Sequence, residues 1–407
     1  MVAKQITQLK PKIEPSIGWI DLHIPATELR LNPTLTCGQA FRWKQTGPDE
    51  YTCAIWNHVI DIKQTPATIL YRTLGTISPA SPDIETSLRD YFQLDTSLVK
   101  LCQEWVKVDP DFADLQQTQN GVRMLRQPVI ETLFTFIASS NNNIKRITML
   151  VDRLCQRFGK PIETQTKGTF YTFPNIEDIA QCTDIEDTFK EMGFGYRAKY
   201  YAATIRYLVD THECPEKFLI GLRQKPLEEA RKELLKLSGV GPKVADCICL
   251  MALDKPDAVP VDTHIWQVAQ KRYVPRLVGN GNSNSKGKVG GSVIAMAEDK
   301  AEFVRELAQQ LAAGKKAPSV KSYEMAQQLI IALFGPYAGW AQGMLFSSNL
   351  GGNGGEKQGK QEKKDSKQEI VPKTKRKTVS ETVETDMNQD TTDGIGSRLR
   401  SQKKKAK

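Results

Sequence analysis

Hydrophobic and polar positions follow two different patterns along this chain. Residues 16 to about 75 carry short apolar runs separated by turn residues such as Thr46–Asp49. The runs of strand length are Ala40–Trp43, Tyr51–Trp56 and His58–Ile62. They predict an antiparallel sheet. From about Ser87 onward the apolar residues recur every three or four positions, which indicates amphipathic helices.

The helical pattern can be divided into separate segments. The first two are Pro128–Ile137 and Ile144–Phe158. Three more follow apolar positions at helical spacing, and Gly335–Pro336 ends the last of these. Their markers are Leu227, Ala230, Leu234 and Leu237; Phe303, Leu307 and Leu311; and Tyr323, Ala326, Ile330 and Leu333. Ala338–Phe346 can form a final short helix.

These patterns predict an α+β protein with an antiparallel sheet domain at residues 16–125 and an all-helical domain at 126–348. Residues 276–293 are rich in Gly, Asn, Ser and Lys, which is typical of a flexible surface insertion. We also expect a flexible N-terminus at 1–15. Residues 349–407 contain no aromatic residue and are expected to form a disordered basic tail.

The 407 residues carry a net charge of +9. Asn349 to Lys407 holds 15 lysines and arginines against 9 acidic residues, so +6 of that charge lies in the tail. Any polyanion binding by the rest of the chain must therefore depend on local placement of charge. Two basic clusters, Lys373–Lys377 and Lys403–Lys407, fit nuclear import, nucleic-acid contact or simple solubilising charge.

The eight cysteines show no C-x-x-C spacing, and the four histidines form no metal-ligand cluster with them. We expect a reduced intracellular protein without structural zinc. No apolar run approaches the roughly 18 residues typical of a membrane span. The N-terminus also lacks the apolar core of a secretory signal. We therefore expect no membrane association.

The most informative local motif is Leu237–Lys243, where a helical pattern ends at two glycines and a new helix begins at Pro242. Gly239 and Gly241 accept positive φ, so the backbone can turn sharply between two helices. Proline suits the first helical position. The N–H groups of such a turn, beside a positive helix end, attract a phosphate. A plain turn between helices is the alternative explanation.

Lys243 lies in the first turn of the second helix, and Asp262 follows about twenty residues later, before another helical segment. Partial burial and the positive helix end would both favour the neutral amine that a nucleophile needs. Lys243 could instead simply bind phosphate, and Asp262 could simply cap its helix. We expect Asp262 to do both: to cap, and to direct a carboxylate into a cleft, which favours covalent chemistry on Lys243.

Around these residues the chain resembles the helix-hairpin-helix glycosylase superfamily and, within it, the eukaryotic 8-oxoguanine DNA glycosylases. The resemblance extends from about Gly18 to Leu350. Its most specific blocks are Gly38–Trp43, Ser140–Ile144, Gly193–Ala198, Val244–Pro256 and Gly335–Gln342. It implies a TBP-like N-terminal antiparallel sheet domain joined to an all-helical helix-hairpin-helix glycosylase domain.

The resemblance implies a bifunctional enzyme of base excision repair that needs no cofactor. Lys243 would attack C1′ of the damaged nucleotide, displace 8-oxoguanine and form a Schiff base, and β-elimination would then nick the strand. Asp262 would stabilise the positive sugar and orient the amine. Base flipping is part of this mechanism, because the base must leave the stack to be reached. The expected partner is duplex DNA with 8-oxoguanine opposite cytosine, bound by a monomer.

Four further residues resemble the contacts of the family to the damaged base. Guanine N7 accepts a hydrogen bond whereas 8-oxoguanine carries N7–H, so one carbonyl can distinguish them. Gly38 resembles the glycine whose backbone carbonyl does this. Cys247 and Phe346 resemble the pair that sandwiches the flipped base, and Gln342 the side chain that reads its Watson–Crick edge. Without the flanking match they would be explained as a turn glycine, core side chains and a surface glutamine.

Other residues resemble contacts to the rest of the DNA. Asn141, Arg146 and Arg197 resemble the residues that hold the estranged cytosine, for which arginine forks are suited. Tyr196 resembles the wedge beside that base, and His264 a phosphate contact. No catalytic metal is implied. A monovalent cation could bind backbone carbonyls in the hairpin, at Leu235, Leu237 and Val240.

Two other functions fit part of the pattern. Glycosylases for oxidised pyrimidines or mispaired adenine often carry a four-cysteine iron–sulfur loop after the hairpin domain, but no cysteine here lies beyond Cys249. A non-catalytic hairpin protein that only binds DNA phosphates is the other alternative. The basic tail favours the nucleus. Residues 1–13, with three lysines and no acidic residue, leave mitochondrial import open.

Overall fold

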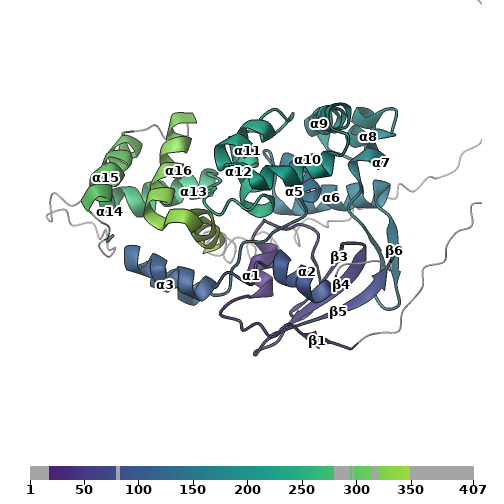
Figure 1. Cartoon of the computed structure of the whole chain (residues 1–407), viewed down its shortest axis with the longest axis horizontal. Helices are drawn as coiled ribbons and strands as arrows, with labels where there is room; N and C mark the ends of the chain where they lie inside the picture. The colour runs from purple at the N-terminus through teal and green to yellow at the C-terminus, as the bar shows by residue number, and fades with distance from the viewer. Residues whose placement is uncertain (1–17, 79–82, 279–293, 296–297, 314–319, 349–407) are drawn as a thin grey trace, which may run out of the picture. The chain divides into compact units, whose positions relative to one another are not determined.

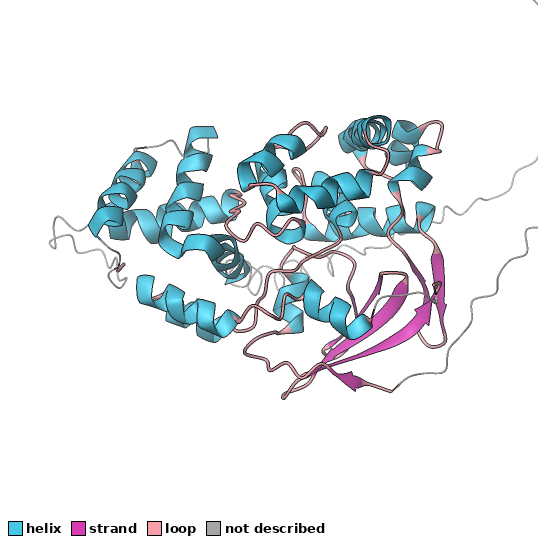
Figure 2. Cartoon of the chain, viewed as in Figure 1, coloured by secondary structure: helices cyan, strands magenta, loops and turns pink. Residues whose placement is uncertain are grey.

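The computed structural model describes residues 18–78, 83–278, 294–295, 298–313 and 320–348 (Figure 1). The flexible N-terminus, most of the insertion and the basic tail predicted from the sequence lie outside these described residues. Within them, the strands gather in one region and helices form the rest, as Figure 2 shows. The predicted α+β organisation is therefore confirmed.

Five antiparallel strands form the main sheet, in the order β1-β5-β4-β3-β2. The strands are β1 (Ile20–Asp21), β2 (Lys44–Gly47), β3 (Glu50–Ile55), β4 (His58–Gln64) and β5 (Ile69–Thr76). A two-residue turn joins β3 to β4, and both of its residues, Trp56 and Asn57, have positive φ (52° and 66°). Such a turn matches the twist of a hairpin, so the sequence Trp56–Asn57 holds the register between the two central strands.

The prediction of a strand at Ala40–Trp43 is wrong. A short helix, α1 (Leu31–Thr36), is followed by an irregular segment, and β2 begins only at Lys44. The run is apolar because Ala40 packs in the sheet core whereas Phe41 packs in the helical core. The segment therefore bridges two cores and pairs with neither edge of the sheet.

The two faces of the sheet are covered differently. Cys53 and Ile60 face a core that they share with α1 and α2 (Ile84–Tyr91). Ala54 and Val59, one position away, pack against Ile162. That residue belongs to a hairpin of β6 (Pro161–Thr164) and β7 (Gly168–Tyr171), which the sequence pattern did not reveal. The hairpin follows the sheet domain by many residues and yet forms part of its packing.

Most of the other described elements are helices that share one large hydrophobic core. The segment Ile144–Phe158 has the bounds predicted from sequence. The remaining helices are α3 (Leu98–Val108), α4 (Phe112–Thr118), α5 (Val129–Ala138), α6 (Ile144–Phe158), α7 (Ile176–Ala180), α8 (Ile185–Glu191), α9 (Ala198–Thr211), α10 (Pro215–Gly221), α11 (Leu227–Leu234), α12 (Pro242–Ala252), α13 (Thr263–Val268), α14 (Val274–Val278), α15 (Glu298–Ala312), α16 (Val320–Phe334) and a last helix at 338–348.

The predicted insertion begins later than its composition indicated. Arg276 lies in α14, where its Nη2 is 2.8 Å from Oδ1 of the fully buried Asp109. Leu277 beside it is also buried. The composition could not reveal this boundary, because the ion pair that holds α14 joins residues far apart in the sequence.

Residues Val320–Ser348 form the one helical stretch, among the residues described, whose length and composition would allow it to cross a membrane. Its most apolar 18-residue window has a mean hydropathy of 1.4, and 61% of that window is buried inside the protein. Gly335, with a φ of 68°, begins a 3₁₀ turn that divides the stretch. Its burial is that of a core helix, and it carries several cavity residues described below.

Candidate active site

The turn between α11 and α12 has the geometry of the predicted hairpin, with one difference. Gly239 has a φ of 81°, and a Cβ there would lie 2.8 Å from Cβ of Tyr200, so only glycine fits. Gly241, however, is extended (φ −95°), so of the two glycines only Gly239 uses the positive φ that both tolerate. A Cβ at Gly241 would meet nothing within 4 Å. The second glycine therefore leaves one side of the turn open.

One hydrogen bond closes this turn and a second connects it to a neighbouring helix. The Val240 N–H donates to the Leu237 carbonyl over 3.1 Å, and Thr204 of α9 donates to the Ser238 carbonyl over 2.8 Å. Helix α12 then begins at Pro242, and the first N–H groups of a helix have no partner inside it. Such an end favours an anion. The cation site proposed at the Leu235, Leu237 and Val240 carbonyls stays a prediction.

One cavity collects all six residues that the sequence assigned to catalysis and base recognition. It measures about 540 Å³ including the space open to solvent. The six lie on four separate parts of the sequence: the segment after α1, helix α12, the start of α13, and the helix at 338–348. They are Gly38, Lys243, Cys247, Asp262, Gln342 and Phe346.

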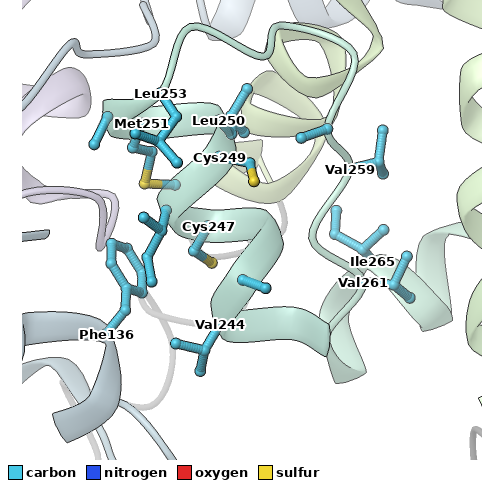
Figure 3. Packing of buried hydrophobic residues seen from close by; sticks show 14 of the residues in the cluster. Phe136, Val244, Cys247, Cys249, Leu250, Met251, Leu253, Val259, Val261 and Ile265 are labelled. Carbon is cyan, nitrogen blue, oxygen red and sulfur yellow. The ribbon is translucent and has the colours of Figure 1, made fainter. Parts of the chain in front are cut away.

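Lys243 and Cys247 lie one helical turn apart on α12 and both line the cavity. The Lys243 ammonium is 5.1 Å from the ring centroid of Phe136 on α5. Burial raises the pKa of the Cys247 thiol to about 11, although the adjacent Lys243 acts in the opposite direction. A neutral thiol offers a packing surface rather than a second nucleophile. Figure 3 shows α12 with Phe136 on one side and Val259, Val261 and Ile265 on the other.

Asp262 has the two roles that were weighed from sequence. Its Oδ1 accepts hydrogen bonds from the backbone N–H groups of His264 (2.9 Å) and Ile265 (3.0 Å), which makes it the N-cap of α13. The same residue lines the cavity. His264 lies beside it, with its ring perpendicular to that of Phe346 at a centroid distance of 5.5 Å. The two capping hydrogen bonds therefore fix the orientation of the Asp262 carboxylate, and the residue still lines the cavity.

Gly38 adopts a backbone conformation that other residues avoid, with a φ of 85°. A Cβ at this position would lie 3.2 Å from Cδ1 of Ile144, at the start of α6. The next residue, Gln39, is buried and donates to the carbonyls of Thr34 (2.9 Å) and Arg123 (2.8 Å). Gly38 is therefore confined by Ile144 on one side and by the hydrogen bonds of Gln39 on the other.

The last helix brings two of the predicted side chains into the cavity. Gln342 is buried to 6% exposure and so differs from an ordinary surface glutamine. Sequence reasoning missed other lining residues. Met251, one turn beyond Cys247 on the same helix face, could have been found from helical spacing. Others come together only through the fold, among them Met124, Phe136, Pro260 and Trp340.

The four residues predicted to contact the opposite strand cluster around the turn between α5 and α6. Arg197, which is 2% exposed, donates through Nε (2.9 Å) and Nη2 to the Ser140 carbonyl, and through Nη2 (2.8 Å) to the Asn141 carbonyl. Tyr196 is half exposed and also donates to the Ser140 carbonyl (3.0 Å). Arg146 is exposed, and Asn141 has a φ of 48°. Two of the three guanidinium nitrogens of Arg197 therefore hold the turn between α5 and α6.

Among the residues that the structure describes, no group of three or more histidine, cysteine, aspartate or glutamate side chains could hold a metal ion. The cavity itself contains the amine of Lys243 and the carboxylate of Asp262.

Comparison with known proteins decides the family. Residues 21–133 match the N-terminal domain of 8-oxoguanine DNA glycosylase, and residues 134–277 match the HhH-GPD superfamily of base excision DNA repair proteins. An N-glycosylase/DNA lyase from Arabidopsis thaliana is 34% identical over 82% of this chain and 80% of its own. The protein belongs to the 8-oxoguanine DNA glycosylase family. An N-glycosylase/DNA lyase of Saccharomyces cerevisiae agrees, at 33% identity over 82% of this chain and 87% of its own.

Solved structures of the 8-oxoguanine DNA glycosylase family have the same fold. MBOgg1 in complex with a low affinity DNA ligand superposes with a TM-score of 0.63 at 25% identity, covering 84% of this chain and 99% of that one. The Clostridium acetobutylicum 8-oxoguanine glycosylase/lyase, bound to duplex DNA with cytosine opposite 8-oxoG, gives a TM-score of 0.59 at 25% identity, covering 80% and 93%. The predicted sheet domain followed by a helix-hairpin-helix domain is thereby confirmed.

Proposed function

We propose that this protein removes 8-oxoguanine opposite cytosine from duplex DNA and then nicks the strand, with Lys243 as the attacking amine. The enzyme class, a DNA N-glycosylase with lyase activity, follows from membership of the family. One observation carries the assignment of residues. An amine, a carboxylate and the expected base contacts, from four parts of the sequence, line one cavity.

The chemistry follows from these groups. The Lys243 amine forms a bond to C1′ while the bond from C1′ to the base breaks, and the base leaves with the electron pair and takes up a proton. The sugar ring then opens to give a Schiff base on Lys243. Loss of a C2′ proton expels the 3′ phosphate by β-elimination. Asp262 is the cavity carboxylate that would stabilise the positive charge developing on the sugar.

Recognition of the lesion is assigned to the backbone carbonyl of Gly38. It would accept a hydrogen bond from the N7–H of 8-oxoguanine, whereas guanine would present an acceptor to an acceptor. Cys247 and Phe346 would enclose the flipped base, and the buried amide of Gln342 would bind its Watson–Crick edge. Support comes from the position of all four residues on the cavity that also contains Lys243.

The DNA backbone and the opposite strand are assigned to the rim. The open side of Gly241 and the start of α12 would bind a phosphate, and His264 would bind another. Arg146 and Tyr196, both exposed, would contact the estranged cytosine and the space left by the flipped base. We further propose a nuclear location because of the basic tail, with mitochondrial import as an alternative.

Borohydride trapping tests the nucleophile. Wild-type protein incubated with an 8-oxoguanine:cytosine duplex and borohydride should form a covalent complex, and Lys243→Gln should not. Parallel duplexes with thymine glycol or no lesion separate this function from a pyrimidine glycosylase and from a binding protein. Trapping and cleavage by Lys243→Gln at the wild-type rate would disprove the assignment of Lys243, and binding without release of any base would favour the non-catalytic alternative.

A further inference from the structure

A buried carboxylate that the mechanism does not use lies three residues after Lys243 on α12. Asp246 is fully buried, and its Oδ1 is 2.9 Å from Nε of Arg231 on α11. Neither of these two atoms makes a well-directed hydrogen bond, so their contact is an ion pair. The other oxygen, Oδ2, accepts from the hydroxyl of Tyr323 and, over 2.9 Å, from the amide of Gln327, both on α16.

The same two side chains of α16 also hold the segment that leads to Asp262. The Val261 N–H donates to the Tyr323 hydroxyl oxygen over 3.4 Å. The Gln327 amide donates its second hydrogen to the Val259 carbonyl over 3.0 Å. Each side chain therefore joins the Asp246 carboxylate to the backbone just before Asp262.

These contacts connect the two helices that begin at the cavity. Lys243 is on α12 with Asp246, whereas Asp262 begins α13 at the end of an irregular segment. We infer that Asp246, Tyr323 and Gln327 are positioning residues, which fix the Asp262 carboxylate relative to the Lys243 amine through the backbone of Val259 and Val261. This inference rests on the proposed roles of Lys243 and Asp262.

Stability alone gives a poor account of this network. A buried ion pair often stabilises a fold no better than apolar side chains of the same volume, because both charges lose their water. Burial raises the pKa of Asp246 to about 6, against the effect of Arg231 and the Tyr323 and Gln327 hydrogen bonds, while Glu228 of α11 acts with burial. The carboxylate thus lies where its charge is unfavourable, in contact with the segment that leads to the proposed catalytic aspartate.

The deciding variant is Tyr323→Phe, which removes only the hydroxyl between Asp246 and Val261. Displacement of a reacting group by about 1 Å can cost about 100-fold in rate, and a partial displacement should lower the single-turnover excision rate about tenfold. The dissociation constant for the lesion duplex should change less than about twofold, because Tyr323 is not among the residues that line the cavity.

A matched control exists elsewhere in the helical domain. Tyr273 donates its hydroxyl to Asp109 over 3.1 Å, and that buried carboxylate also pairs with Arg272 and Arg276. Tyr273→Phe therefore removes a comparable tyrosine–carboxylate bond beside arginines, away from the cavity. It should lower the melting temperature about as much as Tyr323→Phe and leave the excision rate within about twofold of wild type. Equal slowing by both variants would overturn the inference.

A double variant tests whether Tyr323 acts through Asp262. If it does, adding Tyr323→Phe to Asp262→Asn should slow excision less than about twofold further, because the positioned charge is already absent. A full additional tenfold loss would contradict the inference, as would a wild-type rate for Tyr323→Phe alone. Wild type and Lys243→Gln are measured in the same series. A wild type without excision refutes the proposed function and this inference together, whereas active wild type with active Tyr323→Phe refutes only the inference.

Discussion

Asp262 offers the sharpest test of the site, because its structural role and its proposed catalytic role can be separated. Its Oδ1 accepts two backbone N–H groups at the start of α13, at 2.9 and 3.0 Å. Asparagine has an equivalent oxygen and caps helices about as well as aspartate. Alanine has none. The pair Asp262→Asn and Asp262→Ala therefore removes first the charge alone and then the charge together with the cap.

The two losses differ in size and in the property they affect. Loss of an N-cap costs about 1 kcal/mol of unfolding free energy, or about 2 °C in melting temperature for a domain of this size. Loss of a preorganised charge that stabilises a transition state costs about 100- to 1000-fold in rate. Asp262→Asn should therefore melt within about 1 °C of wild type and excise 8-oxoguanine at least about 100-fold more slowly. Asp262→Ala should show both effects.

Single-turnover excision on an 8-oxoguanine:cytosine duplex measures the rate, with hot alkali added to cleave every abasic product so that base removal alone is scored. Thermal unfolding of the same preparations measures the cap. An Asp262→Asn variant that excises at more than about a third of the wild-type rate would show that the charge is dispensable. Asp262 would then be a helix cap that happens to lie in the cavity.

Three further outcomes follow from the structure. Gly38→Ala should slow 8-oxoguanine excision but spare cleavage of a preformed abasic site, because a positive φ costs alanine about 1 kcal/mol and its Cβ would lie 3.2 Å from Ile144; undiminished excision with retained discrimination against guanine would remove Gly38 from the site. Arg146→Ala should weaken the preference for cytosine opposite the lesion without lowering the melting temperature, and an unaltered preference would refute its role. Asp246→Asn should alter the pH dependence of unfolding. Burial raises the pKa of Asp246 in the folded protein to about 6, so the folded state binds a proton more tightly than the unfolded state. As the pH rises from about 4 to about 6.5, the unfolding free energy of wild type should therefore fall by up to about 3 kcal/mol relative to that of the variant. A constant difference in unfolding free energy across that range would contradict this account.

The features that were predictable from sequence are those specified by neighbouring residues. The bounds of α6 could be predicted because Asn143 caps its first turn, with Oδ1 accepting from the Arg146 N–H over 2.9 Å, and Gly159 follows its last residue. The turn before Lys243 could be predicted because a glycine, a proline and the lysine lie within five residues. In both cases the physical cause is local.

The features that could not be predicted depend on contacts between distant segments. The β6–β7 hairpin is held on the sheet partly by Lys167, whose Nζ lies 2.7 Å from Oδ1 of the buried Asp61. Phe136 reaches Lys243 only because α5 packs on α12. Ala40–Trp43 resembled a strand because it is a short, mostly apolar run, yet its residues are buried in two separate cores. The common location of the six cavity residues was expected only through the family resemblance, since no spacing connects Gly38 with Lys243.

Selectivity for the lesion requires more than a carbonyl in the right place. A carbonyl that could rotate would turn away from guanine N7 at little cost in free energy. The repulsion between these two hydrogen-bond acceptors would then no longer disfavour the binding of guanine. In the proposed recognition by Gly38, discrimination would therefore depend on how firmly its backbone is held. Gln39 supplies this restraint from inside the protein: its Nε2 donates to Thr34 and Arg123, its Oε1 accepts from the Leu125 N–H over 3.1 Å, and its own carbonyl accepts from Gln127 over 2.8 Å. With Ile144 packed against the other side of the glycine, the carbonyl cannot move away without breaking buried hydrogen bonds. In the proposed recognition by Gly38, the rejection of guanine would depend on the packing behind the cavity as well as on the cavity surface.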